Sequence, residues 1–228
     1  VLRNGDSYSA KIIVDAGGHN GPIRRDYWNE KSTKIPVKFV LMDGDFGEAV
    51  ELHFGSMAPG GYAWMFPKEK GANIGLGIQR NFAKGRSLNQ CTEQFISKYN
   101  GEVTFNGAGS LPMSGTIKKF VKGNYMLVGD SAGMVLPSNG AGITIAMIGG
   151  RIAGQVITEN LSSGVPLEEY ELRWKKQMGK VMSNSKRSFK LGSLLFRLPD
   201  WILNLMFNRL TKGIIWRAVT CRRMFWIF

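Results

Sequence analysis

The chain has 228 residues, of which 43% are apolar, so it is long enough to bury a hydrophobic core in one or two domains. Its formal net charge of +13 and pI near 9.9 imply an acidic partner: a nucleic acid, an anionic membrane surface or a phosphorylated ligand. Two cysteines, Cys91 and Cys221, exclude a disulfide framework and a cysteine metal site, and they fit a reducing, cytoplasmic location.

The first predicted element is a strand over residues 7–14, where an alternating pattern becomes apolar on entering a buried sheet. A glycine-rich turn follows at residues 15–25 and contains Asp15, His19 and Arg24. We expect His19 to pack or to form hydrogen bonds locally. For Asp15 two interpretations stay open. Its carboxylate either closes over a ligand or caps nearby backbone N–H groups at the end of the strand.

An antiparallel sheet is predicted next, from strand-like segments that alternate with turn signals, at residues 34–42, 48–54, 62–67 and 72–78. A helix with its N-cap at Ser87 follows. Its apolar positions fall roughly on one face and are Leu88, Cys91, Phe95 and Tyr99. The chain then returns through a predicted glycine-rich loop over residues 102–121.

Three aromatic residues alternate along one of these strands, which Pro67 is expected to end, and they therefore share one face: Tyr62, Trp64 and Phe66. Gly75 and Gly77 leave the neighbouring strand without side chains on one face. An aromatic row beside a bare backbone predicts a flat apolar slot for an extended hydrocarbon or a ring. The alternative is an ordinary half-buried sheet face that packs on a helix.

The most informative stretch covers residues 124–151. It predicts a buried strand at 125–128, a turn at Gly129 and Asp130, and a helix from near Gly140. This order places Asp130 at the carboxyl edge of a sheet, where open α/β sheets bind ligands. The loop SNGAG brings bare N–H groups to a helix N-terminus. One alternative is an ordinary loop without a ligand. The other is a membrane span over residues 131–150, which Pro137 disfavours.

The C-terminal part is basic and is predicted to be helical. After residue 166 glutamates precede lysines, as the helix dipole favours, and the apolar face comprises Leu167, Tyr170, Trp174, Met178 and Val181. Cations interleaved with aliphatic and aromatic residues over 188–228 describe a helix in a membrane interface. The alternative is a helical cap with a solvated basic face. Nucleic-acid binding is disfavoured because no recognition module can be read.

Both motifs resemble, in order and spacing, those of the geranylgeranyl reductases, a branch of the glutathione-reductase-like FAD enzymes, and the match covers most of residues 7–160. The resemblance implies that Asp130 bonds the ribityl chain of FAD. It implies further cofactor contacts at Gly129, Pro137, Asn139, Gly140, Ala141, Gly142 and Ile143, and substrate contacts at Tyr62, Trp64, Phe66, Pro67, Gly75 and Gly77. Asp15 and Arg24 match a motif that closes over the cofactor, although Asp-Ala-Gly-Gly replaces its usual Asp-Gly pair.

The same resemblance implies the reduction of isolated C=C bonds in geranylgeranyl chains, of archaeal membrane lipids or of chlorophyll-type groups. Reduced FAD would deliver a hydride from N5, with a ferredoxin or a nicotinamide cofactor as electron donor. Tyr62 is a weak candidate for the proton source, because phenol is a poor acid at neutral pH, and an active-site water is the alternative. A flavin monooxygenase or halogenase and a non-catalytic membrane-binding fragment are the competing functions.

The expected fold is mixed α/β, with two FAD-domain segments (1–29 and 121–165), an inserted antiparallel substrate-binding domain (30–120) and a basic helical region (166–228). No G-x-G-x-x-G motif follows a strand. The sequence is therefore expected to be the C-terminal portion of a larger enzyme, and alone an incomplete one. We expect that enzyme to be peripheral on the cytoplasmic face of the membrane.

Overall fold

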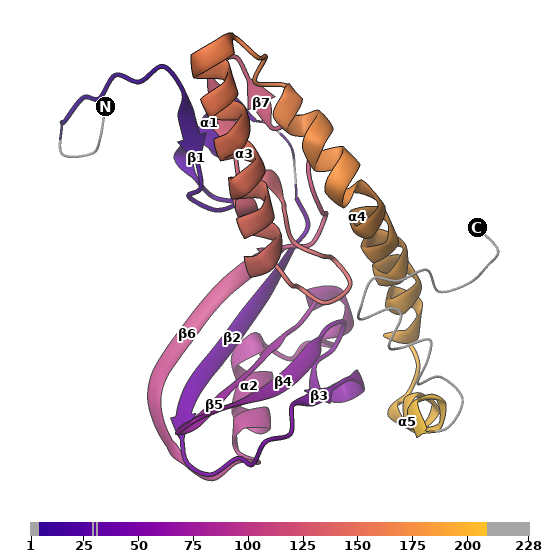
Figure 1. Cartoon of the computed structure of the whole chain (residues 1–228). Coiled ribbons are helices and arrows are strands. Elements are labelled where there is room, and N and C mark those ends of the chain that lie inside the picture. The colour runs from indigo at the N-terminus through magenta and orange to yellow at the C-terminus, as the bar shows by residue number, and fades with distance from the viewer. Residues whose placement is uncertain (1–4, 29, 31, 209–228) are drawn as a thin grey trace. The chain divides into compact units, whose positions relative to one another are not determined.

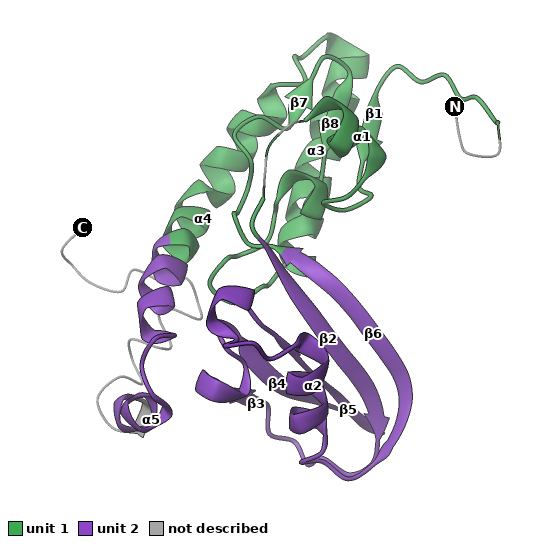
Figure 2. Cartoon of the chain, turned by 180° about the vertical axis from the view of Figure 1, so that it is seen from behind, with its two compact units in different colours: residues 1–33, 112–186 green, residues 34–111, 187–228 purple. Residues whose placement is uncertain are grey.

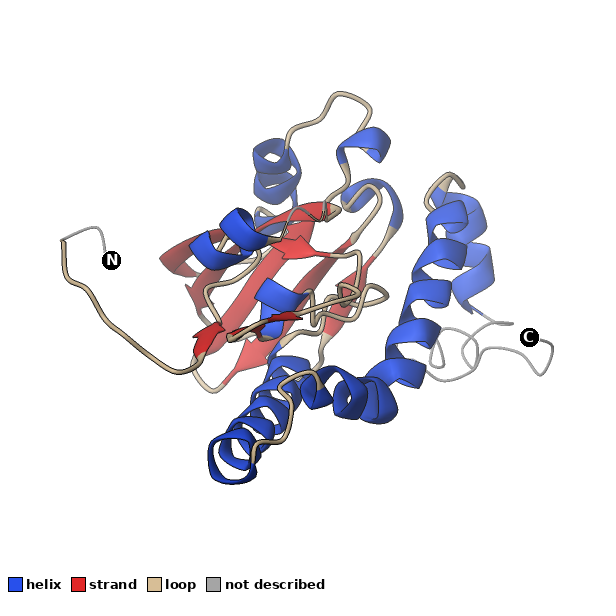
Figure 3. Cartoon of the chain, turned by 90° about the horizontal axis from the view of Figure 1, so that it is seen from above, coloured by secondary structure: helices blue, strands red, loops and turns tan. Residues whose placement is uncertain are grey.

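The computed structural model describes residues 5–28, 30 and 32–208. The chain divides into two compact units (Figure 2), the first formed by residues 1–33 and 112–186 and the second by residues 34–111 and 187–228. Helices and strands both contribute to the structure (Figure 3), and the larger sheet contains antiparallel pairs. The expected mixed α/β fold with an antiparallel sheet is confirmed.

The first unit is built on a three-stranded sheet in the order β1-β8-β7. β1 (Ile13–Asp15) runs parallel to β8 (Tyr125–Leu127), and β7 (Val121–Lys122) pairs antiparallel with β8. The predicted strand over residues 7–14 is wrong for residues 7–12. The partner strand β8 begins at Tyr125, which lies opposite Ile13. Residues 7–12 therefore lie beyond the end of β8 and do not pair with it. The short helix α1 (Pro22–Tyr27) follows β1.

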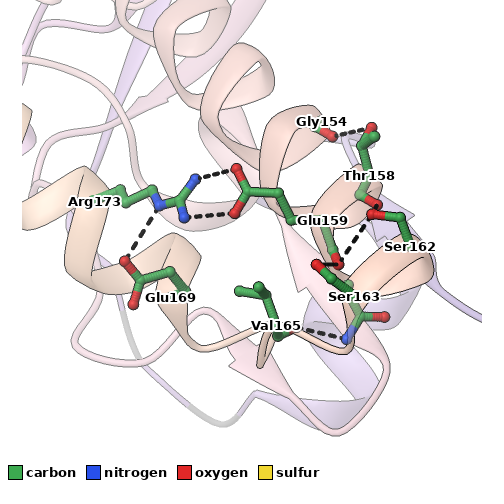
Figure 4. A network of polar contacts seen from close by, with 9 residues as sticks. Gly154, Thr158, Glu159, Ser162, Ser163, Val165, Glu169 and Arg173 are labelled. Carbon is green, nitrogen blue, oxygen red and sulfur yellow. Dashed lines mark hydrogen bonds and ion pairs between the residues drawn. The ribbon is translucent and has the colours of Figure 1, made fainter.

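Two long helices, α3 (Ile143–Ser163) and α4 (Glu169–Leu195), follow one another along the chain (Figure 1). α3 and the part of α4 up to Lys186 belong to this unit, and the rest of α4 belongs to the second. An ion-pair network joins the two helices (Figure 4). The Arg173 guanidinium donates hydrogen bonds of 2.8 and 2.6 Å to the Glu159 carboxylate and one of 3.2 Å to Glu169. Asn160 donates to the Val165 carbonyl oxygen at 2.8 Å. The connection between the helices is thus held by side chains on both.

The buried face of α4 follows a spacing of four residues, through Tyr170, Trp174, Met178 and Met182. The predicted face contained Val181 in place of Met182. Val181 is half-buried, so the buried face shifts around the helix in its second half.

The second unit contains a five-stranded sheet in the order β3-β4-β5-β2-β6. Its strands are β2 (Lys34–Asp43), β3 (Glu51–His53), β4 (Tyr62–Lys68), β5 (Gly71–Gly77) and β6 (Glu102–Pro112). Helix α2 (Leu88–Ile96) begins with the predicted cap, in which Ser87 and Gln90 bond each other's backbone N–H groups. Cys91 and Phe95 of α2 are buried with Met65, Ile74 and Leu76, which come from one face of the sheet.

Two expectations for this sheet are wrong. Residues 102–112 form strand β6 and not a loop, because Gly107 leaves room for the ring of Phe39 on the neighbouring strand. Pro67 does not end β4, which continues to Lys68. β3 pairs with β4 only as far as Met65. At Pro67, β4 has no paired residue on β3, so a proline, which lacks a backbone N–H, removes no hydrogen bond between these two strands.

A short helix α5 (Asp200–Asn208) belongs to the second unit and is anchored to the 3₁₀ turn η1 (Gly55–Met57). Asp200 accepts a hydrogen bond from the Ser56 backbone N–H at 2.9 Å and another from the Ser56 hydroxyl. Leu203 is buried, whereas Trp201 and Leu205 are 68% and 69% exposed. Among the described residues no helix combines the length and the apolar character needed to cross a bilayer. Residues 209–228 of the predicted basic region, with Cys221, lie outside the described residues.

Candidate functional site

The Gly-Asp pair lies where β8 ends. Gly129 has a left-handed backbone (φ 64°) and begins a 3₁₀ turn, η3 (Gly129–Ala132), that contains Asp130. The carboxyl group of Asp130 is half-buried, and burial raises its pKa, with the nearby His19 opposing the shift. A side chain placed at Gly142 would have its Cβ 3.6 Å from Asp130 Oδ1. The carboxylate therefore faces the first residues of α3.

The loop between η3 and α3 folds on itself. The Leu136 N–H donates to the Ala141 carbonyl oxygen at 2.9 Å, and the Gly140 N–H donates to the Leu136 carbonyl oxygen at 2.8 Å. Asn139 Oδ1 accepts from the Ala141 N–H at 3.0 Å. α3 begins at Ile143, three residues later than the predicted start near Gly140, because the left-handed backbone of Gly140 (φ 72°) interrupts helical geometry.

The start of α3 is open. In the described part of the chain its N-cap, Gly142, makes no side-chain cap hydrogen bond, and Ile143 is 83% exposed. Ala141 is exposed as well, and Asn139 and Gly140 are half-buried. Uncapped N–H groups at a helix N-terminus favour an electron-rich ligand atom. The predicted cofactor residues from Gly129 to Ile143 thus share one continuous stretch whose end presents donors to solvent.

Asp15 and Arg24 lie in the same unit, but their polar atoms are engaged by the protein. Asp15 accepts from the N–H groups of Gly17 (2.7 Å) and Arg24 (2.9 Å) and from the Ser131 hydroxyl (3.1 Å). The Arg24 guanidinium donates to the Ser131 carbonyl oxygen, and its burial lowers its pKa. Asp15, Arg24 and Ser131 are all buried. These contacts favour the interpretation of Asp15 as a carboxylate that caps backbone N–H groups.

In the second unit the aromatic row faces the glycines directly. Tyr62 pairs with Gly77, Trp64 with Gly75, and Phe66 with Asn73. The ring centroids of Tyr62 and Trp64 are 5.7 Å apart, and those of Trp64 and Phe66 are 6.0 Å apart. The Phe54 ring, 6.1 Å from that of Tyr62, adds a fourth member that the sequence analysis did not identify.

The expectation of a bare backbone beside the row is wrong at Gly75. A Cβ there would lie 2.6 Å from the Trp64 indole and 2.5 Å from Phe39 Cβ, so these two side chains already cover the glycine. The Trp64 indole is also oriented by a 2.7 Å hydrogen bond to Asn73 Oδ1. The space above Gly75 is therefore filled by the Trp64 ring and by Phe39. These side chains form a continuous apolar surface in place of the expected slot.

Further apolar residues extend this surface across the sheet. Phe39 on β2 pairs with Gly75, and the Phe105 ring on β6 is 6.0 Å from that of Phe39. Leu52 on β3 pairs with Trp64. Leu52, Phe66 and Phe105 are exposed. We call the surface formed by these residues with Tyr62 and Trp64 the aromatic face. Alternation along β2 and β6 was the sequence signal for Phe39 and Phe105.

The titratable groups of this unit differ in their chemistry. Burial raises the pKa of the Tyr62 phenol, so it is a still weaker acid than an exposed tyrosine. Glu51 accepts hydrogen bonds from His53 Nε2 (2.9 Å) and the Tyr99 hydroxyl (2.8 Å), which lower its pKa. Because His53 pairs with the core residue Ala63, this cluster lies on the sheet face opposite the aromatic face.

Residues 33–108 match the family described as the geranylgeranyl reductase catalytic domain. Digeranylgeranylglycerophospholipid reductase 2 of Methanothermobacter thermautotrophicus is 38% identical over 170 residues, which are 72% of this chain and 43% of that protein. Digeranylgeranylglycerophospholipid reductase 3 of Methanosphaera stadtmanae is 34% identical over 228 residues, or 92% of this chain and 56% of that protein. The chain thus spans about half the length of these curated relatives.

Solved structures show the same fold. A geranylgeranyl bacteriochlorophyll reductase-like protein from Thermoplasma acidophilum superposes with a TM-score of 0.76 at 24% identity, over 93% of this chain and 58% of that one. A flavin-dependent halogenase from Brevundimonas superposes with a TM-score of 0.61 at 18% identity, over 98% of this chain and 43% of that one. The chain therefore shares the fold of these two proteins. Over most of its length the chain is similar to members of the geranylgeranyl reductase family.

Proposed function

We propose that the protein to which this chain belongs is an FAD-dependent reductase of isolated C=C bonds in the geranylgeranyl chains of membrane lipids. The match of residues 33–108 to the geranylgeranyl reductase catalytic domain carries this proposal, because that segment contains the aromatic face. An alkene chain offers no polar group to bind, so recognition depends on shape and apolar contact. The exposed rings of Phe66 and Phe105, beside the half-buried rings of Tyr62 and Trp64, supply such contact.

The residues of the first unit fit an FAD. In the proposal Asp130 accepts a hydrogen bond from the ribityl chain, and the uncapped N–H groups at the start of α3 meet the electron-rich pyrimidine end of the flavin. Gly140 and Gly142 let the flavin approach the main chain. Asp15 and Arg24 support the turn that carries Asp130. Bound reduced FAD would supply the hydride for one alkene carbon.

The proton for the second alkene carbon has two candidate sources, Tyr62 and a water molecule. The raised pKa of Tyr62 favours the water, because a general acid works best when its pKa lies near the operating pH. Replacement of Tyr62 with phenylalanine would then preserve most of the turnover. The electron donor, a ferredoxin or a nicotinamide cofactor, is part of the proposal without a preference between the two.

The proposal includes peripheral contact with the cytoplasmic face of an anionic membrane. Trp201, Leu205 and Leu194 are exposed apolar side chains at the end of α4 and on α5. They stand among cations, and no acidic residue occurs between positions 172 and 199. We expect Trp201→Glu to weaken sedimentation with vesicles of anionic lipid several-fold. Leu172→Ala, at another exposed leucine, is the control. Equal binding by both variants would contradict the membrane contact.

The test of the reductase function uses the longest natural form of the protein, purified without added cofactor. We expect a flavin absorption spectrum that dithionite bleaches and that a geranylgeranyl lipid restores under anaerobic conditions. The lipid product should gain two hydrogen atoms per double bond, measured by mass spectrometry. A protein that binds no flavin would refute the proposal. An oxygen-dependent hydroxylated or halogenated product would establish the competing monooxygenase or halogenase function.

A further inference from the structure

One polar side chain occupies the buried face of α4 within the first unit. After Tyr170, Trp174, Met178 and Met182, the next buried position is Ser185, which is 0% exposed. A buried hydroxyl needs a hydrogen-bond partner, and an apolar residue would be the ordinary choice for this face. We therefore expect the Ser185 hydroxyl to be hydrogen-bonded to a particular group of the protein.

That group lies in the loop before α3. The Ser138 N–H donates to Ser185 Oγ at 3.0 Å, and the two hydroxyl oxygens are 2.9 Å apart. Ser138 lies between Pro137 and Asn139, two residues of the proposed flavin loop. The bonds described at Leu136, Asn139 and Ala141 are internal to this loop and fix its shape, whereas the bonds between Ser138 and Ser185 connect the loop to α4.

A second contact from α4 holds the preceding end of the same segment. The Tyr170 hydroxyl donates to the Leu127 carbonyl oxygen at 3.3 Å and contacts Met134 Sδ at 3.7 Å. Tyr170 and Ser185 are roughly 22 Å apart along the helix, at 1.5 Å per residue. α4 therefore supports the segment from β8 to α3 at two separated points.

We propose that Ser185 is a positioning residue for the flavin. By bonding Ser138, it fixes the loop over residues 136–142 and with it the direction of the N–H groups at the start of α3. This inference rests on the proposed function, because it assumes that the loop contacts the flavin. Without the Ser185 hydroxyl, the Ser138 N–H loses this acceptor, and this bond between the loop and α4 is removed.

The test compares Ser185→Ala with Ser188→Ala in the longest natural form of the protein. Ser188 is also a buried serine of α4 but is not bonded to the loop in the described part of the chain. For Ser185→Ala we expect FAD affinity to fall about ten-fold. We also expect a changed visible circular dichroism spectrum of the bound flavin at saturation. Ser188→Ala should retain the wild-type affinity and spectrum. Ser138→Ala should have a smaller effect, because its backbone N–H still bonds Ser185.

The spectrum separates positioning from general stability, since a variant that is merely less stable binds its flavin in the wild-type environment once saturated. Wild-type affinity and spectrum in Ser185→Ala would overturn the inference. Equal changes in Ser185→Ala and Ser188→Ala would overturn it as well. If Ser185→Ala does not fold, Ser185→Cys replaces it, with an intermediate loss of affinity supporting the inference and none overturning it. A wild-type protein without flavin would instead refute the proposed function.

Discussion

The half-buried carboxyl group of Asp130 has a raised pKa, mainly because burial disfavours its charged form. A raised pKa means that the unfolded state releases this proton at a lower pH than the folded state. The free energy of unfolding therefore falls as the pH rises from the unfolded pKa through the folded pKa. At neutral pH the charged Asp130 is thus a cost to the folded state in the absence of a ligand.

We predict that Asp130→Asn raises the free energy of unfolding of the flavin-free protein at pH 7 and lowers its FAD affinity. The neutral amide avoids the desolvation of a charge, but it is a poorer hydrogen-bond acceptor for a ribityl hydroxyl group. Denaturant unfolding and flavin titration measure the two effects, and the gain in stability should disappear below the pKa of the unfolded carboxyl. A variant that is less stable at pH 7 would contradict this assignment.

Glu51 shows the opposite linkage. Hydrogen bonds from His53 and Tyr99 lower its pKa, so its contribution to stability is present above the unfolded pKa of a glutamate and is lost as the pH falls through the lower folded pKa. We predict that Tyr99→Phe moves the pKa of Glu51 back towards its ordinary value and reduces the loss of stability in acid. Carboxyl chemical shifts followed during an NMR titration report this directly. An unchanged Glu51 pKa would show that the Tyr99 bond is absent in solution.

At the scale of elements, the packing of rings on glycines gives the second unit a sharp test. In Gly75→Ala the new Cβ would lie 2.5–2.7 Å from Phe39 Cβ, the Trp64 indole and the Lys38 carbonyl oxygen. Such overpacking costs roughly 1–3 kcal/mol of unfolding free energy. The control is Gly109→Ala, whose Cβ would meet only Val37 Cγ2, at 3.8 Å. Urea unfolding should show a lower free energy of unfolding for Gly75→Ala than for Gly109→Ala. Equal values would contradict the close packing of Trp64 and Phe39 on Gly75.

The elements that the sequence predicted correctly are those with strong local signals. Alternation identified β2, β4 and β5, and the Ser87 capping box identified α2. β6 was mistaken for a loop because glycines disfavour strands locally, whereas here Gly107 accepts a ring from another strand. The strand over residues 7–14 was overextended because its length depends on β8, far along the chain. In both cases the extent of the strand depends on a neighbouring strand that is distant in sequence, which the local residue pattern does not reveal.

The candidate site was predictable to the same degree. The Gly-Asp pair and the following loop are contiguous, so their sequence pattern sufficed to group them. Ser131 and Ser185 were missed, because their partners Asp15 and Ser138 are 116 and 47 residues distant along the chain. A serine at a buried position of α4 was the available signal for Ser185. The covering of Gly75 by Trp64 could not be read either, since it depends on side-chain direction.

At the scale of the whole molecule, the charge of +13 makes a prediction about salt. If anionic lipid attracts the basic C-terminal region, vesicle binding should weaken as added salt shortens the Debye length from about 10 Å near 0.1 M to about 3 Å near 1 M. Sedimentation of the protein with anionic vesicles across this range measures the effect. Neutral vesicles are the control and should show little salt dependence. Binding to anionic vesicles that salt does not change would rule out an electrostatic contribution.

The rings that lie on Gly75 and Gly107 have a consequence for how this protein can change over generations. Each glycine and the ring that covers it fill one shared volume, so neither can be altered freely while the other stays the same. A larger residue at position 75 would meet the Trp64 ring, Phe39 Cβ and the Lys38 carbonyl oxygen, so it would be tolerated better alongside changes at positions 64 and 39. The same dependence links positions 107 and 39. Among related sequences, substitutions at these glycines should therefore occur together with substitutions at the residues whose rings cover them.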